Sequence, residues 1–368
     1  MAIRWSEDDV RFMRRALALA SRGHPAPNPY VGAVLVRSGE VVAEGYHRLV
    51  GTDHAEAAAL KRAGAAAHGA TLYVTLEPCC HQGRTPPCTD AITAAGVSRV
   101  VAAVKDPNPT VNGGGIRRLR RKGVRVDIGL LEQEARAQNR MHFHYHATGR
   151  PWVTVKAAMS LDGKIATVTG ESKWITDEAA RRIAHKLRAE HAAVLVGART
   201  AEMDSPRLTV RLPGIKAKPV RVLLDYDLRV PVEQPIYDGD ASTIVFFCRA
   251  PRTSSTRLLS RGVHLEQVAG SEGRLDLHEV LKRLANWGIT SVLVEGGGEV
   301  IASFLKTRLV DRVCFFYAPL ILGGSQAKTA VEGSGVATIA GAVRLRNASV
   351  MRAGSGWMVD GEPDYPME

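Results

Sequence analysis

Short apolar runs alternate with helix-like segments along nearly the whole chain, and this order restricts the possible folds more than any other feature. In the first half, strand candidates lie at residues 32–36, 41–44, 71–75, 99–104 and 124–128, and helix candidates at 6–20, 54–63, 88–95 and 116–122. Strands that alternate with helices favour a sheet covered by helical layers. We therefore predict an α/β fold in which the first two strands form a β-hairpin across Ser38-Gly39.

The alternation restarts after a turn-forming cluster at residues 148–151. Strand candidates follow at 152–158, 193–196, 220–224, 243–248, 291–294 and 311–318, and helix candidates at 177–191, at 277–286 and after Gly298. The chain has 368 residues, more than twice the roughly 150 of a typical domain. Residues 1–148 and 149–368 are therefore expected to form two α/β domains.

Composition and charge restrict the class of protein. The chain is 45% hydrophobic and 23% charged, which argues against a disordered or fibrous protein. No apolar run reaches the ~18 residues that cross a bilayer, and acidic residues stand where a signal peptide would be apolar. We therefore expect a cytoplasmic protein with no membrane partner. The net charge of +12 favours anionic partners such as nucleic acid or a phosphorylated small molecule.

The densest basic run has six cations: Arg117, Arg118, Arg120, Arg121, Lys122 and Arg125. It has no interleaved aromatic residues, on which the bases of a nucleic acid would stack. A solvated helix face is therefore the favoured interpretation, and a nucleic-acid groove is the alternative.

Four residues of the first half have the spacing of a catalytic metal site. His54 begins a predicted helix, Cys79 follows a predicted strand, and Cys88 begins the next helix. One imidazole and two thiolates, with a fourth position left for water, are the ligands of a catalytic zinc ion. Glu56 lies two residues from His54, so we expect it to take a proton from the water and pass it to a leaving amine.

This set matches the zinc-deaminase signature His-x-Glu…Pro-Cys-x-x-Cys, except that eight residues rather than two separate the cysteines. A structural zinc site completed by Cys80 or His81 is one alternative, and reduced core cysteines are another. Neither gives Glu56 a task, so zinc-dependent deamination is the favoured interpretation.

Three segments of the first half resemble the deaminase domain of the bifunctional riboflavin-biosynthesis deaminase–reductases. They are residues 27–32 (PNPYVG), 77–88 (EPCCHQGRTPPC) and 106–109 (DPNP). The resemblance implies a cytidine deaminase-like three-layer domain with one zinc ion per chain. It also implies that Asn28 helps to hold a pyrimidine and that the loop at 81–85 shapes the substrate end of the pocket. Asp53 and Cys80 depart from the family, which usually has proline and serine there.

Segments of the second half resemble the reductase domain of the same family, which has a dihydrofolate reductase-like fold. They are residues 156–166, 170–176, 197–211 and 294–299. The last of these runs through a glycine-rich turn into a helix, where backbone N–H groups can meet a phosphate. The two resemblances together cover essentially the whole chain.

The resemblance implies two sets of contacts in the second domain. NADPH would contact Ala158, Trp174, Thr200, Asp204 and the turn of Gly297, Gly298, Glu299, Val300, Ile301, Ala302 and Ser303. The substrate would contact Ser172, Arg188, Leu208, Arg211 and Glu295. Arginines suit a 5′-phosphate, although a helix-surface arginine is the alternative for Arg188. Tyr226 departs from the family, so no role is carried over to it.

The resemblance implies an enzyme with two activities. Zinc-dependent hydrolysis of the 2-amino group of 2,5-diamino-6-ribosylamino-4(3H)-pyrimidinone 5′-phosphate would come first. NADPH-dependent reduction of the ribosyl group would then give 5-amino-6-ribitylamino-uracil 5′-phosphate. The expected partner is thus a phosphorylated pyrimidine–ribose substrate and not a nucleic acid, and we expect a homo-oligomer. The alternatives are a nucleic-acid or free-base zinc deaminase with an unrelated C-terminal module, and a zinc-organised binding module without turnover.

Two smaller expectations concern residues outside these sets. His142, His144 and His146 alternate in the sequence, and an exposed linker is favoured over a strand face that binds a second metal. Lys156 and Asp162 are candidates for a buried ion pair near the second site.

Overall fold

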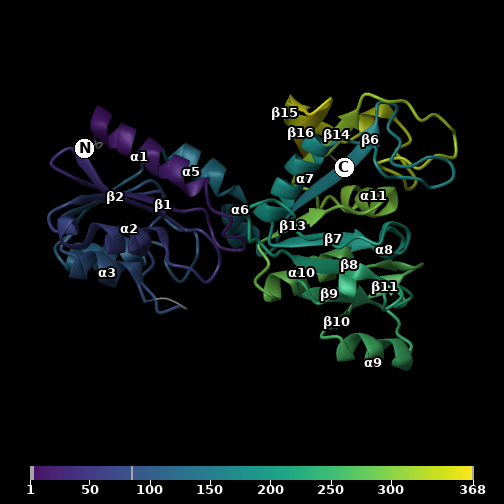
Figure 1. Ribbon diagram of the computed structural model, residues 1–368, viewed down its shortest axis with the longest axis horizontal. Coiled ribbons are helices and arrows are strands. Elements are labelled where there is room, and N and C mark those ends of the chain that lie inside the picture. Colours follow the sequence, from purple (N-terminus) through teal and green to yellow (C-terminus); the bar gives the residue numbers. More distant parts are fainter. Residues whose placement is uncertain (1–3, 84–85, 367–368) are drawn as a thin grey trace. The chain divides into compact units, whose positions relative to one another are not determined.

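The computed structural model describes residues 4–83 and 86–366 (Figure 1). The chain divides into two compact units, Met1–Gly149 and Arg150–Glu368. Each unit has its own sheet. Among the described helices, none is both long and apolar enough to span a membrane.

The first unit is built on a five-stranded sheet of order β2-β1-β3-β4-β5. Its strands are β1 (Gly32–Arg37), β2 (Glu40–Tyr46), β3 (Thr71–Val74), β4 (Arg99–Ala102) and β5 (Arg125–Ile128). Strand β1 is antiparallel to β2 and β3, whereas β3, β4 and β5 are parallel. The carboxyl ends of β2, β3 and β4 therefore lie at one edge of the sheet.

Helices cover both faces of this sheet. They are α1 (Glu7–Ala20), α2 (Ala55–Ala63), the 3₁₀ turn η1 (Gly64–Ala67), α3 (Cys88–Ala94), α4 (Gly114–Arg121), α5 (Glu132–Gln138) and α6 (Arg140–Thr148). One core cluster joins Phe12 and Met13 of α1 to the sheet. The other joins Leu60 of α2 and Leu119 of α4 to its opposite face. The unit thus has three layers, as predicted.

Helix α1 begins where the sequence pattern places it. The Ser6 hydroxyl accepts from the Asp9 backbone, and the Asp9 carboxylate accepts from the Ser6 backbone, which satisfies two donors at the helix start. The helix lies close to β1 at Gly32, where a Cβ would come within 2.0 Å of the Ala16 carbonyl oxygen. Only glycine permits this approach.

The second unit is built on a nine-stranded sheet of order β10-β9-β8-β7-β13-β6-β14-β16-β15. Its strands are β6 (Trp152–Ser160), β7 (Ala193–Gly197), β8 (Val220–Leu224), β9 (Thr243–Phe247), β10 (His264–Gln267), β13 (Ser291–Val294), β14 (Arg312–Ala318), β15 (Arg344–Ala353) and β16 (Gly356–Asp364). In this order the seven strands from β10 to β14 are parallel to one another, and β16 is antiparallel to both of its neighbours, β14 and β15. A separate hairpin pairs β11 (Gly270–Ser271) with β12 (Arg274–Leu275).

The helices of this unit are α7 (Glu178–Glu190), α8 (Ala198–Asp204), α9 (Arg252–Ser260), α10 (Leu277–Asn286) and α11 (Gly298–Lys306), with 3₁₀ turns η2 (Pro235–Tyr237) and η3 (Ile339–Gly341). Helix α8 follows β7 directly, and α11 follows β13 after a short glycine-rich turn. The parallel strands place both connections at the same edge of the sheet, where open α/β sheets bind ligands.

The three alternating histidines are neither on a strand nor in an exposed linker, so both interpretations were wrong. They lie in α6, and His142 is buried with its Nε2 2.9 Å from the Asp106 carboxylate. The rings of His142 and His146 are in edge contact, as residues four apart on a helix can be.

The basic run lies on and after α4, and three of its side chains are engaged within the unit. Arg118 donates to the Cys80 carbonyl and pairs with Asp90, Arg120 donates to the Val126 carbonyl, and Arg125 pairs with Asp127.

Candidate active sites

Three donor side chains meet at the carboxyl-end edge of the first sheet. Their donor atoms, one from each of His54, Cys79 and Cys88, lie within 4.8 Å of one another. His54 Nδ1 is 3.6 Å from Cys79 Sγ and 3.4 Å from Cys88 Sγ. Tetrahedral coordination at zinc bond lengths separates neighbouring ligand atoms by roughly 3.6 Å. This donor set therefore fits a zinc ion.

Glu56 lies beside this group but is not part of it. It is buried in the first turn of α2, and its carboxyl group contacts the Cys88 thiol. Burial and the nearby Cys79 raise the pKa of Glu56 to about 7. Hydrogen bonds from Cys88 and His54 lower the pKa of the Cys79 thiol to about 4, although burial opposes this. A buried carboxyl group next to a thiolate is thus placed to exchange a proton.

The carboxylate of Glu77 holds the cysteine loop in place. It is buried and accepts from the backbone N–H groups of Asp106, Gly113 and Ile116. It therefore caps the start of α4, an end that favours negative charge. A Cβ at Gly115 would come within 2.0 Å of the Pro78 carbonyl oxygen, so α4 and the loop before Cys79 are closely packed.

Cys80 points away from the donor group. Its sulfur lies 3.9 Å from the Thr110 carbonyl oxygen, and it is not among the clustered donors of the described residues. The only described metal-donor cluster is thus the three-residue set, and the alternative of a site completed by Cys80 or His81 is not supported. Arg84 and Thr85 lie outside the described residues.

Asn28 reaches the metal-donor group through a histidine that sequence reasoning missed. Its amide nitrogen is 3.0 Å from His47 Nε2, and the rings of His47 and His54 are in edge contact at 5.2 Å. His47 is buried and follows β2 directly. A histidine just after a strand could be recognised as a site residue only if the strand order were known, because that order brings the carboxyl ends of β2 and β3 to one edge of the sheet.

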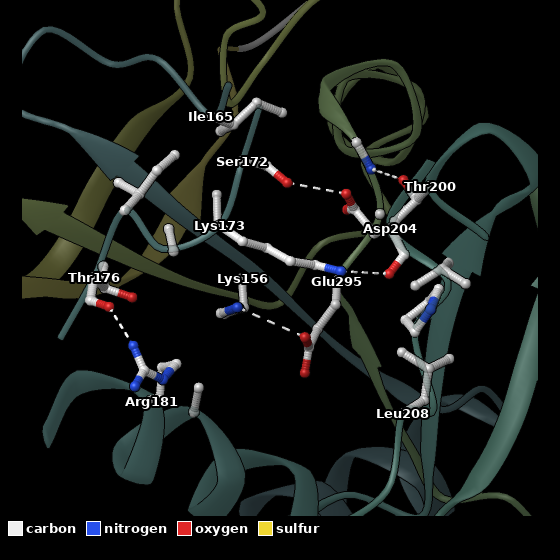
Figure 2. A pocket seen from close by; sticks show the side chains of 18 of the residues that line it. Lys156, Ile165, Ser172, Lys173, Thr176, Arg181, Thr200, Asp204, Leu208 and Glu295 are labelled. Atoms are coloured by element: carbon white, nitrogen blue, oxygen red, sulfur yellow. Dashed lines mark hydrogen bonds and ion pairs between the residues drawn. The ribbon is translucent and has the colours of Figure 1, made fainter. Parts of the chain in front are cut away.

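A pocket of about 620 Å³ lies at the carboxyl-end edge of the second sheet (Figure 2). Figure 2 shows Lys156 of β6, Thr200 and Asp204 of α8, and Glu295 just after β13 pointing into one space. Ser172 donates to the Asp204 carboxylate at 3.0 Å. This bond ties the loop before α7 to α8.

The centre of this pocket is a buried ionic cluster. Arg188 Nε and Nη2 donate to the two oxygens of Glu295 at 2.7 and 2.9 Å, and Lys156 Nζ lies 3.6 Å from the same carboxylate. Burial would raise the pKa of Glu295, but the two cations outweigh it and hold that pKa well below its usual range. Glu295 is therefore an anion at physiological pH.

The expected pairing of Lys156 with Asp162 was wrong. Asp162 instead accepts from the backbone N–H groups of Leu322 and Gly323. Burial and the neighbouring Arg188 and Arg211 lower the pKa of His185, a pocket residue that sequence reasoning missed, to about 4.

A second pocket, of about 710 Å³, shares Ser172, Thr200, Asp204 and Gly297 with the first, so the two form one groove. The start of α11 lines it. The Gly297 N–H donates to the Thr200 hydroxyl at 3.0 Å, and a Cβ at Gly298 would come within 2.4 Å of the Thr329 carbonyl oxygen. These two contacts fix the position of the helix start, and the start of a helix that lines a pocket is a general site for phosphate groups.

The structure brings nearly all the expected second-half residues to this groove. The first pocket is lined by Ala158, Ser172, Trp174, Arg188, Thr200, Asp204, Leu208, Arg211, Glu295, Gly297 and Ile301. The second is lined by Ser172, Thr200, Asp204, Gly297, Gly298, Glu299, Val300 and Ser303. Ala302 lines neither. Arg188 is not a helix-surface residue, since it is mostly buried against Glu295.

Comparison with known proteins identifies the family. A riboflavin biosynthesis protein RibD from Aquifex aeolicus is 42% identical over 355 residues, which cover 96% of this chain and 98% of that protein. The chain belongs to the RibD family. Solved RibD structures agree: that of Acinetobacter baumannii matches with a TM-score of 0.88 at 36% identity, covering 97% of this chain and 99% of that one.

The two halves of this RibD-family chain match separate family models. Residues 6–104 match the cytidine and deoxycytidylate deaminase zinc-binding region, and residues 151–359 match the RibD C-terminal domain. A further solved structure, a diaminohydroxyphosphoribosylaminopyrimidine deaminase/5-amino-6-(5-phosphoribosylamino)uracil reductase from Thermotoga maritima, matches at 37% identity with a TM-score of 0.80, covering 97% of this chain and 99% of that one. The chain is therefore a bifunctional riboflavin-biosynthesis enzyme, and the alternative with an unrelated C-terminal module is wrong.

Proposed function

We propose that the first unit removes the 2-amino group of 2,5-diamino-6-ribosylamino-4(3H)-pyrimidinone 5′-phosphate, and that the second unit reduces the ribosyl group of the product with NADPH. The observation that supports the first step is the donor set of His54, Cys79 and Cys88 with Glu56 beside it. The observation that supports the second is the groove that joins the glycine-lined start of α11 to the buried Glu295 cluster.

In the deaminase unit, His54, Cys79 and Cys88 would hold one zinc ion per chain. When bound, zinc makes a water molecule acidic enough to act as a nucleophile near neutral pH. Glu56 takes a proton from that water and returns it to the leaving amine, so water is consumed and ammonia released. Asn28, whose amide nitrogen is 3.0 Å from His47 Nε2, would hydrogen-bond the pyrimidine.

In the reductase unit, the start of α11 would hold the cofactor phosphates, together with Ala158, Trp174, Thr200 and Asp204. When bound, NADPH would supply a hydride to C1′, which opening of the sugar to an imine makes electrophilic, and a proton from solvent would go to the imine nitrogen. Because this chemistry is supplied by cofactor and substrate, the protein's task is chiefly orientation.

The substrate would lie against Glu295, Ser172 and Leu208. Glu295 is an anion that can accept from ribose hydroxyls. The N–H groups of Arg188 already donate to Glu295 and to the Thr209 carbonyl, so Arg188 would act on the substrate chiefly by orienting this carboxylate toward it. Arg211 is exposed, and among the described residues its guanidinium has one hydrogen bond, a weak one of 3.5 Å to the Thr209 hydroxyl, so it is the better partner for the 5′-phosphate.

The test supplies the diaminopyrimidine nucleotide and NADPH to the zinc-loaded full chain. Ammonia release and loss of NADPH absorbance are followed together. Both should occur in equal amounts, with ammonia first. Ammonia without NADPH oxidation would refute the reductase assignment, and neither signal would refute both. The homo-oligomeric state, the cytoplasmic location and the absence of a nucleic-acid partner stay predictions.

A further inference from the structure

Five cations line the wider pocket of the groove: Arg199, Arg229, Arg274, Lys306 and Lys328. Three of them form ion pairs at 3.2–3.3 Å: Arg229 with Glu202, Arg274 with Glu299, and Lys328 with Glu332. Within residues 4–83 and 86–366, neither Arg199 nor Lys306 has a side-chain ion pair or hydrogen bond. Arg199 is also exposed. These two cations are therefore available to an anionic ligand.

Arg199 and Tyr226 lie at the same edge of the sheet. Strands β7 and β8 are parallel neighbours, and Gly197 at the end of β7 is paired with Leu224 at the end of β8. Arg199 and Tyr226 each follow two residues beyond these partners. Both residues thus lie just past the carboxyl ends of neighbouring strands, Arg199 in the first turn of α8, and both line the wider pocket.

Arg199 is also close to the glycine-rich turn, whereas Lys306 is not. The next residue after Arg199 is Thr200, whose hydroxyl accepts from the Gly297 N–H at 3.0 Å. Lys306 lies eight residues beyond Gly298 at the other end of α11, about 12 Å along the helix axis. A ligand whose phosphates lie at the start of α11 thus has Arg199 nearby.

Tyr226 supplies a flat surface at the same end of the groove. Its ring is half-buried and packs against Gly270, where a Cβ would come within 2.9 Å of Tyr226 Cε2. The Arg249 guanidinium lies 6.0 Å from the ring centroid. Asp227 and Glu272 line this end too, so a phosphate here needs a directed partner, because the local charge is mixed.

We propose that Arg199 binds the phosphate on the adenosine 2′-oxygen, the group by which NADPH differs from NADH, and that Tyr226 packs against the adenine. This inference rests on the proposed function, in which the groove holds NADPH. A guanidinium can donate two parallel N–H groups to one phosphate, and this geometry suits recognition of a terminal dianion. Arg199 is then the residue that selects the cofactor.

Calorimetric titration of the full chain with two probes tests this role without relying on activity. The first probe is adenosine 2′,5′-bisphosphate (2′,5′-ADP), which carries the 2′-phosphate. The second is adenosine 5′-diphosphate (5′-ADP), which does not. The Arg199→Ala variant should bind 2′,5′-ADP about 10- to 100-fold more weakly, the loss expected for a charged hydrogen bond, and should bind 5′-ADP as before. Arg199→Lys should recover part of the loss. Lys306→Ala, the matched control for an unpaired groove cation, should bind both probes normally.

Three results would overturn the inference: equal weakening of both probes by Arg199→Ala, no weakening of either, or loss of 2′,5′-ADP binding in Lys306→Ala instead. Titration with NADPH and NADH separates this failure from that of the proposed function. A wild-type chain that binds neither dinucleotide refutes the proposed function as well. A wild-type chain that prefers NADPH, with the preference kept in Arg199→Ala, refutes only the role of Arg199.

Discussion

The metal-donor group and the reductase groove differ in how their residues are distributed along the chain. All three metal donors lie between residues 54 and 88, and two of them begin or precede a helix. The central contact of the groove joins Arg188 to Glu295, 107 residues apart. A site built from neighbouring turns can be recognised by spacing and ligand chemistry. A site built across a sheet depends on strand order, which spacing does not reveal.

The largest expected effect tests whether the two sites work independently. Glu56→Gln keeps the size of the side chain but cannot accept the proton, so ammonia release should fall by about 10²- to 10⁴-fold. Oxidation of NADPH with the already deaminated nucleotide should be unchanged. The measurement is both rates on one preparation, with zinc content determined by metal analysis.

The zinc content decides what the loss means. A normal metal content confirms the proton-transfer role, since the structure places Glu56 outside the donor group. If zinc is lost together with activity, Glu56 is a metal ligand, and the description of the metal-donor group as His54, Cys79 and Cys88 is wrong.

The second prediction concerns the ionic cluster of the groove. Arg188→Ala leaves the buried Glu295 carboxylate with Lys156, at 3.6 Å, as its remaining ion-pair partner in the described part of the chain. Removing one partner of a buried pair costs about 3 to 5 kcal/mol. The second unit should unfold at lower urea concentration, which hydrogen exchange of the full chain can follow unit by unit. Deaminase activity should persist at urea concentrations that unfold the second unit.

A matched control separates the charge from the packing. The Arg188→Ala, Glu295→Gln double variant removes the unpaired charge and should recover part of the lost free energy of unfolding. If the double variant is as unstable as the sum of the two single variants, the cluster is not coupled as its geometry indicates.

Much of the fold could be predicted from the sequence, and the exceptions have physical reasons. Helix α10 has its predicted bounds, and the structure shows why: Asp276 caps it, and its buried leucines repeat at helical spacing. Strand β15 was missed because nearly all its residues are exposed, so no apolar alternation marks it. The histidines of α6 alternate with other residues as on a strand, yet Asn139 before them bonds the backbone of Tyr30 and His142 bonds Asp106, which fixes a helix there.

The same limit applies to the sites. The sequence prediction paired Lys156 with Asp162 because the two are near in sequence. The observed partner, Glu295, follows a neighbouring strand but is 139 residues away along the chain. His47 was missed because nothing in its local sequence marks it. Sequence spacing predicted the three side chains that the structure brings together as a metal-donor group, whereas the groove residues were predicted only from the resemblance.

The smallest expected effect concerns Asp9, which links α1 to two strands of the sheet that carries the metal-donor group. Asp9 of α1 accepts from Tyr73 of β3 and from Arg99 of β4, 90 residues away. Burial would raise the pKa of Asp9, but these hydrogen bonds outweigh it and lower the pKa to about 2 from the model-compound value of 3.8. A carboxyl group whose pKa falls on folding stabilises the folded state above its unfolded pKa, and loses that contribution as the pH falls through its folded pKa.

Asp9 should therefore contribute about 2 kcal/mol to the free energy of unfolding of the first unit at pH 7, and roughly half of that at pH 3. The measurement is the difference between wild type and Asp9→Asn in urea unfolding across this pH range, followed by hydrogen exchange of amides in β3 and β4. Asp8→Asn is the matched control, because Asp8 pairs with Arg11 at the surface, and this substitution should change the free energy by less than about 0.5 kcal/mol at any pH. A difference for Asp9→Asn that does not shrink below pH 4 would mean that its loss does not act through the charge of the carboxylate, neither at the Arg99 ion pair nor at the helix cap. The link between α1 and the strands that carry the cysteine loop would then be one of packing alone.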